Sequence, residues 1–211
     1  AQAALCPANI LTAPPIAVSP SLYAKLNYDA VRDFAPISLV AAIQNIMVVH
    51  NSVPAKNVKE FIALARKHPG KLNYGSPGIG SSGHLAGEAF VMMAGVKMLH
   101  VPYKGAPAAI IGVVAGQIDV GVPSVTSALP LINQGKLKAL AVTSATRSFI
   151  APDVPTLAES GLTGYDISSW QAFFAPGGTP RPIVDRLYAE TAKALKAPDV
   201  VKRLTADGSG I

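Results

Sequence analysis

The chain has 211 residues, of which half are hydrophobic and 14% are charged, a composition typical of a folded globular protein and not of a disordered one. Apolar runs end well before the roughly 18 residues that a spanning helix needs, so we expect no direct membrane insertion. The net charge is +6, but the basic residues are scattered and aromatic residues make up only 6%. This pattern argues against nucleic-acid binding and favours small anionic ligands.

The first 50 residues predict short, proline-interrupted elements, and a regular pattern begins near residue 55. Strands are expected at 9–12, 36–42, 46–50, 72–74, 98–101, 118–122, 137–143 and 168–175. Helices are expected at 19–23, 58–68, 85–94, 106–115, 124–133, 156–160, 180–196 and 200–206. The alternation of helices and strands in the middle of the chain predicts a parallel sheet covered on both faces.

The most informative segment is the glycine–serine loop, residues 75–83, between an expected strand and an expected helix. Its four glycines let backbone N–H groups converge without a steric penalty, and its serines add adaptable donors. The start of the helix adds unpaired N–H groups and a partial positive charge. These parts suit a carboxylate or a phosphate. The alternative is a plain strand-to-helix turn in which a serine caps the helix.

Three known motifs can be tested against this loop. Gly78, Gly80 and Gly83 spell G-x-G-x-x-G, but the following strand carries no acidic residue for a ribose, which argues against a dinucleotide. No Gly-Lys-Ser/Thr closes the loop, so it is not a P-loop. No serine lies in G-x-S-x-G, so the nucleophile elbow of hydrolases is absent.

His84 follows the loop directly and has three possible roles: holding the shape of the loop, contacting a ligand, or neither. Glu88 lies one helical turn further on and is placed to orient it. The other histidines, His50, His68 and His100, have no second ligand at metal-binding spacing. Cys6 is the only cysteine, which excludes an intrachain disulfide.

No paired carboxylates and no plausible triad are evident, so we expect no enzyme activity, no catalytic residue, no cofactor and no metal. Two alternatives stay open. One is a hydrolase that uses Ser76 or Ser82 with His84. The other is a ligand-sensing domain that acts through a partner protein.

Seven motifs in a fixed order resemble one known family, and the similarity runs from about residue 16 nearly to the end. They are 22–29 (LYAKLNYD), 33–40 (DFAPISLV), 69–76 (PGKLNYGS), 80–85 (GSSGHL), 100–105 (HVPYKG), 135–143 (GKLKALAVT) and 174–180 (FAPGGTP). The family is that of the Bug or TctC-like proteins, the periplasmic solute-binding components of tripartite tricarboxylate transporters.

The resemblance implies a periplasmic-binding-protein-like (Venus flytrap) α/β fold with two three-layer α/β/α domains. Residues 51–165 would form domain 2, and residues 1–50 and 166–211 would be parts of an incomplete domain 1. The family's usual Asp-Gly-Tyr-Thr is replaced by residues 4–7, and the chain looks shortened at both ends. A periplasmic location and a partnership with the transporter's membrane components are also implied.

The implied ligand is a small carboxylate: a di- or tricarboxylate, an acidic amino acid or an aromatic acid, held between the domains. Lys104 would add charge complementarity, although a solvated side chain is the simpler reading. Tyr103 and Trp170 would line the site or serve interdomain packing. The complete set of expected ligand-binding residues is Ser76, Gly78, Gly80, Ser81, Ser82, Gly83, His84, Tyr103, Lys104, Ser124, Trp170 and Thr12.

Overall fold

The computed structural model describes residues 9–12, 14–206 and 208–210. Contacts divide the chain into two compact units, one formed by Ala1–Ala42 with Ser169–Ile211 and the other by Ile43–Ser168. Cys6 and residues 4–7, on which expectations rested above, lie outside the described residues. Within the described part of the chain, no helix is both long enough and apolar enough to cross a membrane.

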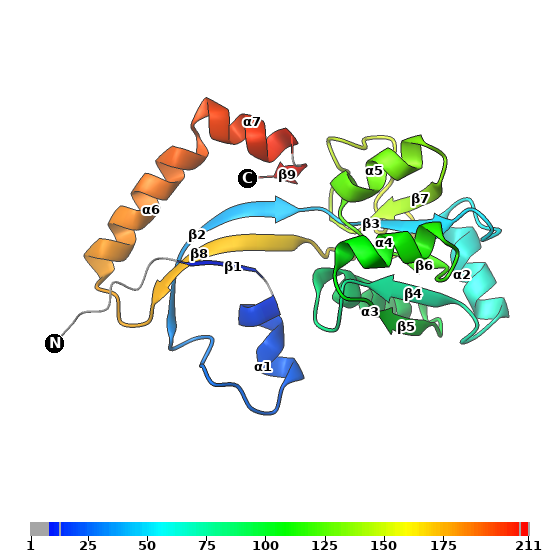
Figure 1. The fold of residues 1–211 in the computed structure, drawn as a ribbon, viewed down its shortest axis with the longest axis horizontal. Coiled ribbons are helices and arrows are strands. Elements are labelled where there is room, and N and C mark those ends of the chain that lie inside the picture. The colour runs from blue at the N-terminus through cyan, green and yellow to red at the C-terminus, as the bar shows by residue number, and fades with distance from the viewer. Residues whose placement is uncertain (1–8, 13, 207, 211) are drawn as a thin grey trace. The chain divides into compact units, whose positions relative to one another are not determined.

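The first unit is built on a four-stranded sheet in the order β1-β8-β2-β9 (Figure 1). Its elements are β1 (Asn9–Thr12), η1 (Pro14–Val18), α1 (Ser19–Leu22), β2 (Phe34–Ile43), β8 (Ser169–Pro176), α6 (Arg181–Leu195), α7 (Pro198–Ala206) and β9 (Ser209–Gly210). Its buried cluster is small and consists of Ile37, Ala175 and Val184, with partly buried apolar neighbours around them.

The second unit is built on a five-stranded sheet in the order β5-β4-β6-β3-β7, with helices on both faces (Figure 1). Its elements are β3 (Ile46–His50), α2 (Val58–Lys67), β4 (Asn73–Ser76), α3 (Ser82–Ala94), β5 (Leu99–Pro102), α4 (Ala106–Val114), β6 (Val120–Gly121), α5 (Val125–Asn133) and β7 (Leu137–Val142). These elements fall close to the expected positions.

Strand β3 departs from the sequence-based expectation in two ways. It pairs antiparallel with β6 and with β7, which makes the sheet mixed, whereas β6 and β7 run in the same direction, as expected for the strands of the helix–strand alternation. Strands β4, β5 and β6 are parallel to one another. Because β3 is hydrogen-bonded between β6 and β7 in this sheet, the unit begins at Ile43, earlier than the expected residue 51.

The side chains of β3 build the cores on both sides of the sheet. Ile46 and Val48 belong to the cluster beneath α4 and α5. Met47 and Val49 belong to the cluster beneath α2 and α3. Alternate strand residues point to opposite faces, and all four are buried, which explains the uninterrupted apolar run in the sequence. This strand therefore fixes the three-layer α/β/α architecture of the second unit.

Candidate functional site

The glycine–serine loop connects β4 to α3, as expected. Ser81 is the N-cap of α3, and its hydroxyl accepts the amide of His84. Gly78 and Gly80 have φ values of +140° and +80°, and residues that carry a Cβ atom rarely adopt such values. The loop therefore needs glycine at these two positions for its backbone conformation.

Two hydroxyl groups of the loop form hydrogen bonds with the loop's own backbone. Ser76 is fully buried, and its Oγ lies 3.2 Å from both the amide nitrogen and the carbonyl oxygen of Gly78. The Ser81 hydroxyl donates to the same carbonyl at 2.7 Å. Ser76 was expected to offer its hydroxyl to a ligand, but burial and these contacts make it a structural residue of the loop.

His84 fastens the loop from the helix side. The Gly80 amide donates to Nδ1 of His84 at 3.1 Å, which matches the first of the three roles considered for this residue. The amide of Gly80 is thereby occupied and not free for a ligand. Because Nδ1 acts as the acceptor, this contact requires that Nδ1 carry no proton.

Behind the loop lies a ring stack formed by Tyr74, His100 and His84. The ring centroids of His100 and His84 are 4.2 Å apart, and those of His100 and Tyr74 are 4.8 Å apart. Nε2 of His100 lies 2.7 Å from the Ser76 hydroxyl. Glu88, expected to orient His84, instead accepts the hydroxyl of Tyr74. The register of β4 and β5 explains the stack, because Tyr74 is paired with His100.

Burial and charge both act on this cluster. Burial lowers the pKa of His100, the neighbouring His84 lowers it further, and Glu88 opposes them. Burial and the hydrogen bond to Glu88 raise the pKa of the Tyr74 hydroxyl. The neutral forms of both rings are thus favoured in the folded protein.

Two donors remain available at the start of α3. Ser82 and Gly83 are its first two residues, and their amides make no hydrogen bond within the described part of the chain. The half-buried Ser82 hydroxyl also makes no hydrogen bond with any described residue. A Cβ at Gly83 would lie 2.9 Å from the Val122 carbonyl oxygen, so only glycine fits. Unpaired amides at a positive helix end are a general anion-binding arrangement.

A second helix begins at the same edge of the sheet. Ser124 follows β6 and caps α5, accepting the amide of Ser127 at 3.4 Å. Ser124 also forms a bridge with Asn45, whose carbonyl accepts the amide of Thr143 beyond β7. Asn45 is 4% exposed, and its Nδ2 has no partner among the described residues. Asn45 was not predicted as a site residue, because only the antiparallel direction of β3 brings it to this edge.

Tyr103 and Lys104 follow strand β5, and their side chains have different surroundings. The Tyr103 ring packs inside the second unit, where a Cβ on Gly112 would lie 2.5 Å from its hydroxyl oxygen. It therefore packs against its own unit, a role that the sequence did not suggest. Lys104 is exposed and forms no ion pair with any described residue, in agreement with a solvated side chain.

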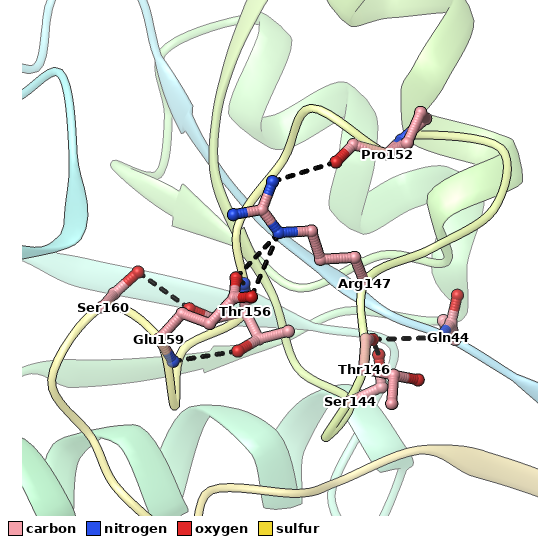
Figure 2. Close-up of polar contacts among 8 residues, drawn as sticks. All are labelled: Gln44, Ser144, Thr146, Arg147, Pro152, Thr156, Glu159 and Ser160. Carbon is pink, nitrogen blue, oxygen red and sulfur yellow. Dashed lines mark hydrogen bonds and ion pairs between the residues drawn. The ribbon is translucent and has the colours of Figure 1, made fainter.

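In the loop that follows β7, an ion pair joins Arg147 to Glu159 (Figure 2). Nε of Arg147 lies 2.9 Å and 3.2 Å from the two carboxylate oxygens of Glu159, and Nη1 donates to the Pro152 carbonyl at 3.1 Å. Glu159 and Thr156 exchange the two hydrogen bonds of a capping box, each of 2.9 Å. They close a single turn, however, and not the helix expected at 156–160.

The remaining expected residues belong to the first unit. Trp170 lies on β8 and is partly exposed. Thr12 ends β1, where its backbone is paired with Gln171. Their part in ligand binding stays a prediction. Among the described residues, no group of three or more His, Cys, Asp or Glu side chains is placed to hold a metal ion.

Residues 9–210 match the family described as the tripartite tricarboxylate transporter family receptor. The chain belongs to this family. Among curated members, a protein encoded in the tcbD-tcbE intergenic region of Pseudomonas sp. strain P51 is 42% identical over 183 residues. That alignment covers 86% of this chain and 54% of the relative. BugT of Bordetella pertussis is 31% identical and is covered to 60%. The chain thus spans little more than half the length of these receptors.

Solved structures place the fold among periplasmic binding proteins. Rpa4515 of R. palustris with adipate has a TM-score of 0.85 and 34% identity, covering 96% of this chain and 68% of its own. MatC from Rhodopseudomonas palustris with bound malate has a TM-score of 0.81 and 32% identity, covering 95% and 68%. The periplasmic binding protein BugD also has a TM-score of 0.81, with 34% identity and coverage of 95% and 67%.

Proposed function

We propose that this receptor-family chain captures a small carboxylate as part of an extracytoplasmic solute-binding protein. The observation that carries the proposal is the pair of unpaired amides, Ser82 and Gly83, at the start of α3. Convergent N–H groups with a partial positive charge match a carboxylate in geometry and sign. The neighbouring hydroxyl of Ser82 adds a third donor on the same turn.

Relatives support the ligand class. Two similar structures contain adipate and malate, which are both dicarboxylates. The family description names a transporter receptor, so we further infer a periplasmic location and delivery of the ligand to the membrane components of a tripartite transporter. Binding and not turnover is the proposed activity.

A hydrolase is the alternative that the sequence left open, with Ser76 or Ser82 acting through His84. Several observations speak against this reading. The hydroxyl of Ser76 is buried and close to His100, while Nδ1 of His84 is occupied by the Gly80 amide. We expect no covalent labelling by a serine-reactive phosphonate, measured by intact mass spectrometry. A stoichiometric adduct on Ser76 or Ser82 would overturn the non-enzymatic assignment.

The proposed donor can be removed by one substitution that suits the helix. Ser82→Pro deletes the N–H at the first helical position, where proline is favoured, and the extended ψ of 160° at Ser81 accepts a following proline. Ser82→Ala is the matched control, since it removes the hydroxyl but keeps the amide. Malate and adipate serve as probes in calorimetric titrations.

We expect Ser82→Pro to weaken binding about 10- to 100-fold relative to Ser82→Ala, as a charged hydrogen bond contributes about 1.5–3 kcal/mol. Both variants should keep the far-UV circular dichroism of the unsubstituted chain. Equal affinity of the two variants, or no saturable binding of any carboxylate by the unsubstituted chain, would count against the proposal.

A further inference from the structure

The ring stack is joined to the glycine–serine loop at two points. His84 accepts the Gly80 amide through Nδ1, and His100 contacts the Ser76 hydroxyl, which in turn contacts Gly78. The two imidazoles lie 4.2 Å apart with an angle of 30° between their planes. The loop that precedes the free amides of α3 is therefore held by two imidazole side chains.

Protonation of His84 is incompatible with the hydrogen bond that it accepts from Gly80. A proton on Nδ1 of His84 would turn the acceptor into a donor that faces the Gly80 N–H. Two cationic rings in contact would also repel each other. Glu88 is the acidic group that acts on the stack, through the Tyr74 hydroxyl, and it is exposed.

Other charged groups near the stack sit at the ends of β4 and β5. Asp119 is engaged by the Asn73 amide at the start of β4, at 2.9 Å. Helix α4 and strand β6, which pack against β4, carry no ionisable side chain. The flanking lysines are Lys71, Lys97 and Lys104. The surroundings therefore offer little compensation for a second positive charge in the stack.

We propose that His84 and His100 are positioning residues whose joint neutrality keeps the glycine–serine loop in its binding conformation, so that acidification opens the loop and releases the ligand. The inference rests on the proposed function for the identity of the site, but the loop movement itself does not require a ligand. It assigns His100, a residue of β5, a role that the sequence did not suggest.

The sign of the effect follows from linkage. His100 has a lowered pKa in the folded chain, so between that value and the unfolded value of about 6.5 the unfolded chain binds more protons. Stability is therefore lost as the pH falls through about 6.5, and the loss levels off below the folded pKa. Ligand affinity should fall over the same interval.

The first test needs no ligand. The amide resonance of Gly80 and the imidazole resonances of His84 and His100 are followed by NMR on the whole chain between about pH 8 and pH 5. We expect Gly80 to shift with the same midpoint as His84, because its acceptor disappears. A Gly80 resonance that does not move while His84 titrates would overturn the proposal.

The second test uses His84→Asn, in which the amide oxygen replaces Nδ1 as an acceptor that cannot be protonated. Malate affinity of the unsubstituted chain should fall about tenfold or more from about pH 8 to pH 5.5, corresponding to one pKa unit of coupling. His84→Asn should abolish most of this dependence, while the exposed His68→Asn should retain it. A pH-independent affinity in the unsubstituted chain, or unchanged pH dependence in His84→Asn, would contradict the inference.

The two tests separate the hypotheses. If no carboxylate binds at any pH but Gly80 follows His84, the proposed function fails and the loop switch stands. If malate binds and Gly80 is insensitive to pH, the switch fails and the binding function stands.

Discussion

Ser76 shows how one buried hydroxyl can organise a loop. It is fully buried at the end of β4, and it contacts His100 at 2.7 Å and the backbone of Gly78 at 3.2 Å. From the sequence alone, a serine beside a glycine suggests a hydroxyl that faces solvent and can bind a ligand. The strand pairing shows instead that His100 lies beside it. Burial then assigns it to the structure of the loop.

Ser76→Ala should destabilise the chain by about 1–3 kcal/mol, since it leaves partners of the buried hydroxyl unsatisfied. Urea denaturation followed by circular dichroism measures this change. Ser21→Ala, at an exposed position in the first unit, is the control and should stay within about 0.5 kcal/mol. A neutral effect of Ser76→Ala would mean that the hydroxyl contacts contribute nothing net.

Gly87 makes room for the ring of Tyr74. A Cβ on Gly87 would lie 2.1 Å from Cε2 of that ring, which stacks on His100 and is tied to Glu88. We expect Gly87→Ala to cost about 1–3 kcal/mol through overpacking, despite the better helix propensity of alanine. Thermal and urea unfolding measure the loss. Met92→Ala on the same helix, where Met92 is 77% exposed, should be nearly neutral; equal effects would contradict the steric account.

Helices and strands could be predicted where the residues that determine them are close together in the sequence. Capping residues, glycines and apolar periodicity located α2, α3 and β4 closely, and they placed the glycine–serine loop before a helix. The orientation of β3 was not predictable, because strand direction depends on distant partners in β6 and β7. For the same reason the stack of His84 on His100 could not be read from two histidines that are far apart in the chain.

The turn at Thr156 is an element whose contacts were predicted but whose length was not. Its capping-box hydrogen bonds form, yet the chain turns away after one turn near Gly161, where φ is +111°. Thr156→Ala should cost about 1 kcal/mol, and Thr156→Ser, which keeps the hydroxyl, should cost clearly less. Thermal unfolding at neutral pH compares the two. Equal losses would show that packing of the methyl group dominates.

Glu159 makes this turn sensitive to acid. The hydrogen bond from the Thr156 amide, followed by that from Arg147, holds the pKa of Glu159 below its ordinary value. A carboxylate whose pKa is lowered by folding stabilises the folded chain fully at pH values above its unfolded pKa, which is near 4.3. That stabilisation is lost as the pH falls through the folded pKa. Glu159→Gln should therefore destabilise the chain more at pH 7 than at pH 3. A similar destabilisation at both pH values would exclude the carboxylate as its cause.

At the scale of the whole molecule, the two units differ in the size of their cores. Both large buried clusters belong to Ile43–Ser168, whereas the cluster of the first unit contains three buried residues. Burying apolar surface is the main source of stability, at about 25 cal/mol per Å². The second unit is therefore the one equipped to fold independently.

A chain restricted to Ile43–Ser168 should fold cooperatively. We expect a dispersed amide NMR spectrum and a single urea transition that coincides by fluorescence and circular dichroism. The complete chain serves as the reference. A collapsed spectrum or two separated transitions in the isolated unit would show that its sheet depends on residues outside these bounds.

The position of β3 between β6 and β7 has a consequence for synthesis on the ribosome. Among the strands of the five-stranded sheet β3 is made first, yet its two neighbours, β6 and β7, are made much later, and β7 ends at Val142. Until then, the run Ile46 to Val49 has no lasting partner, and unpaired apolar strands in nascent chains are prone to aggregation. The feature that fixes the mature architecture thus delays its completion, so this segment is where a chaperone that shields newly made chains would be of most use.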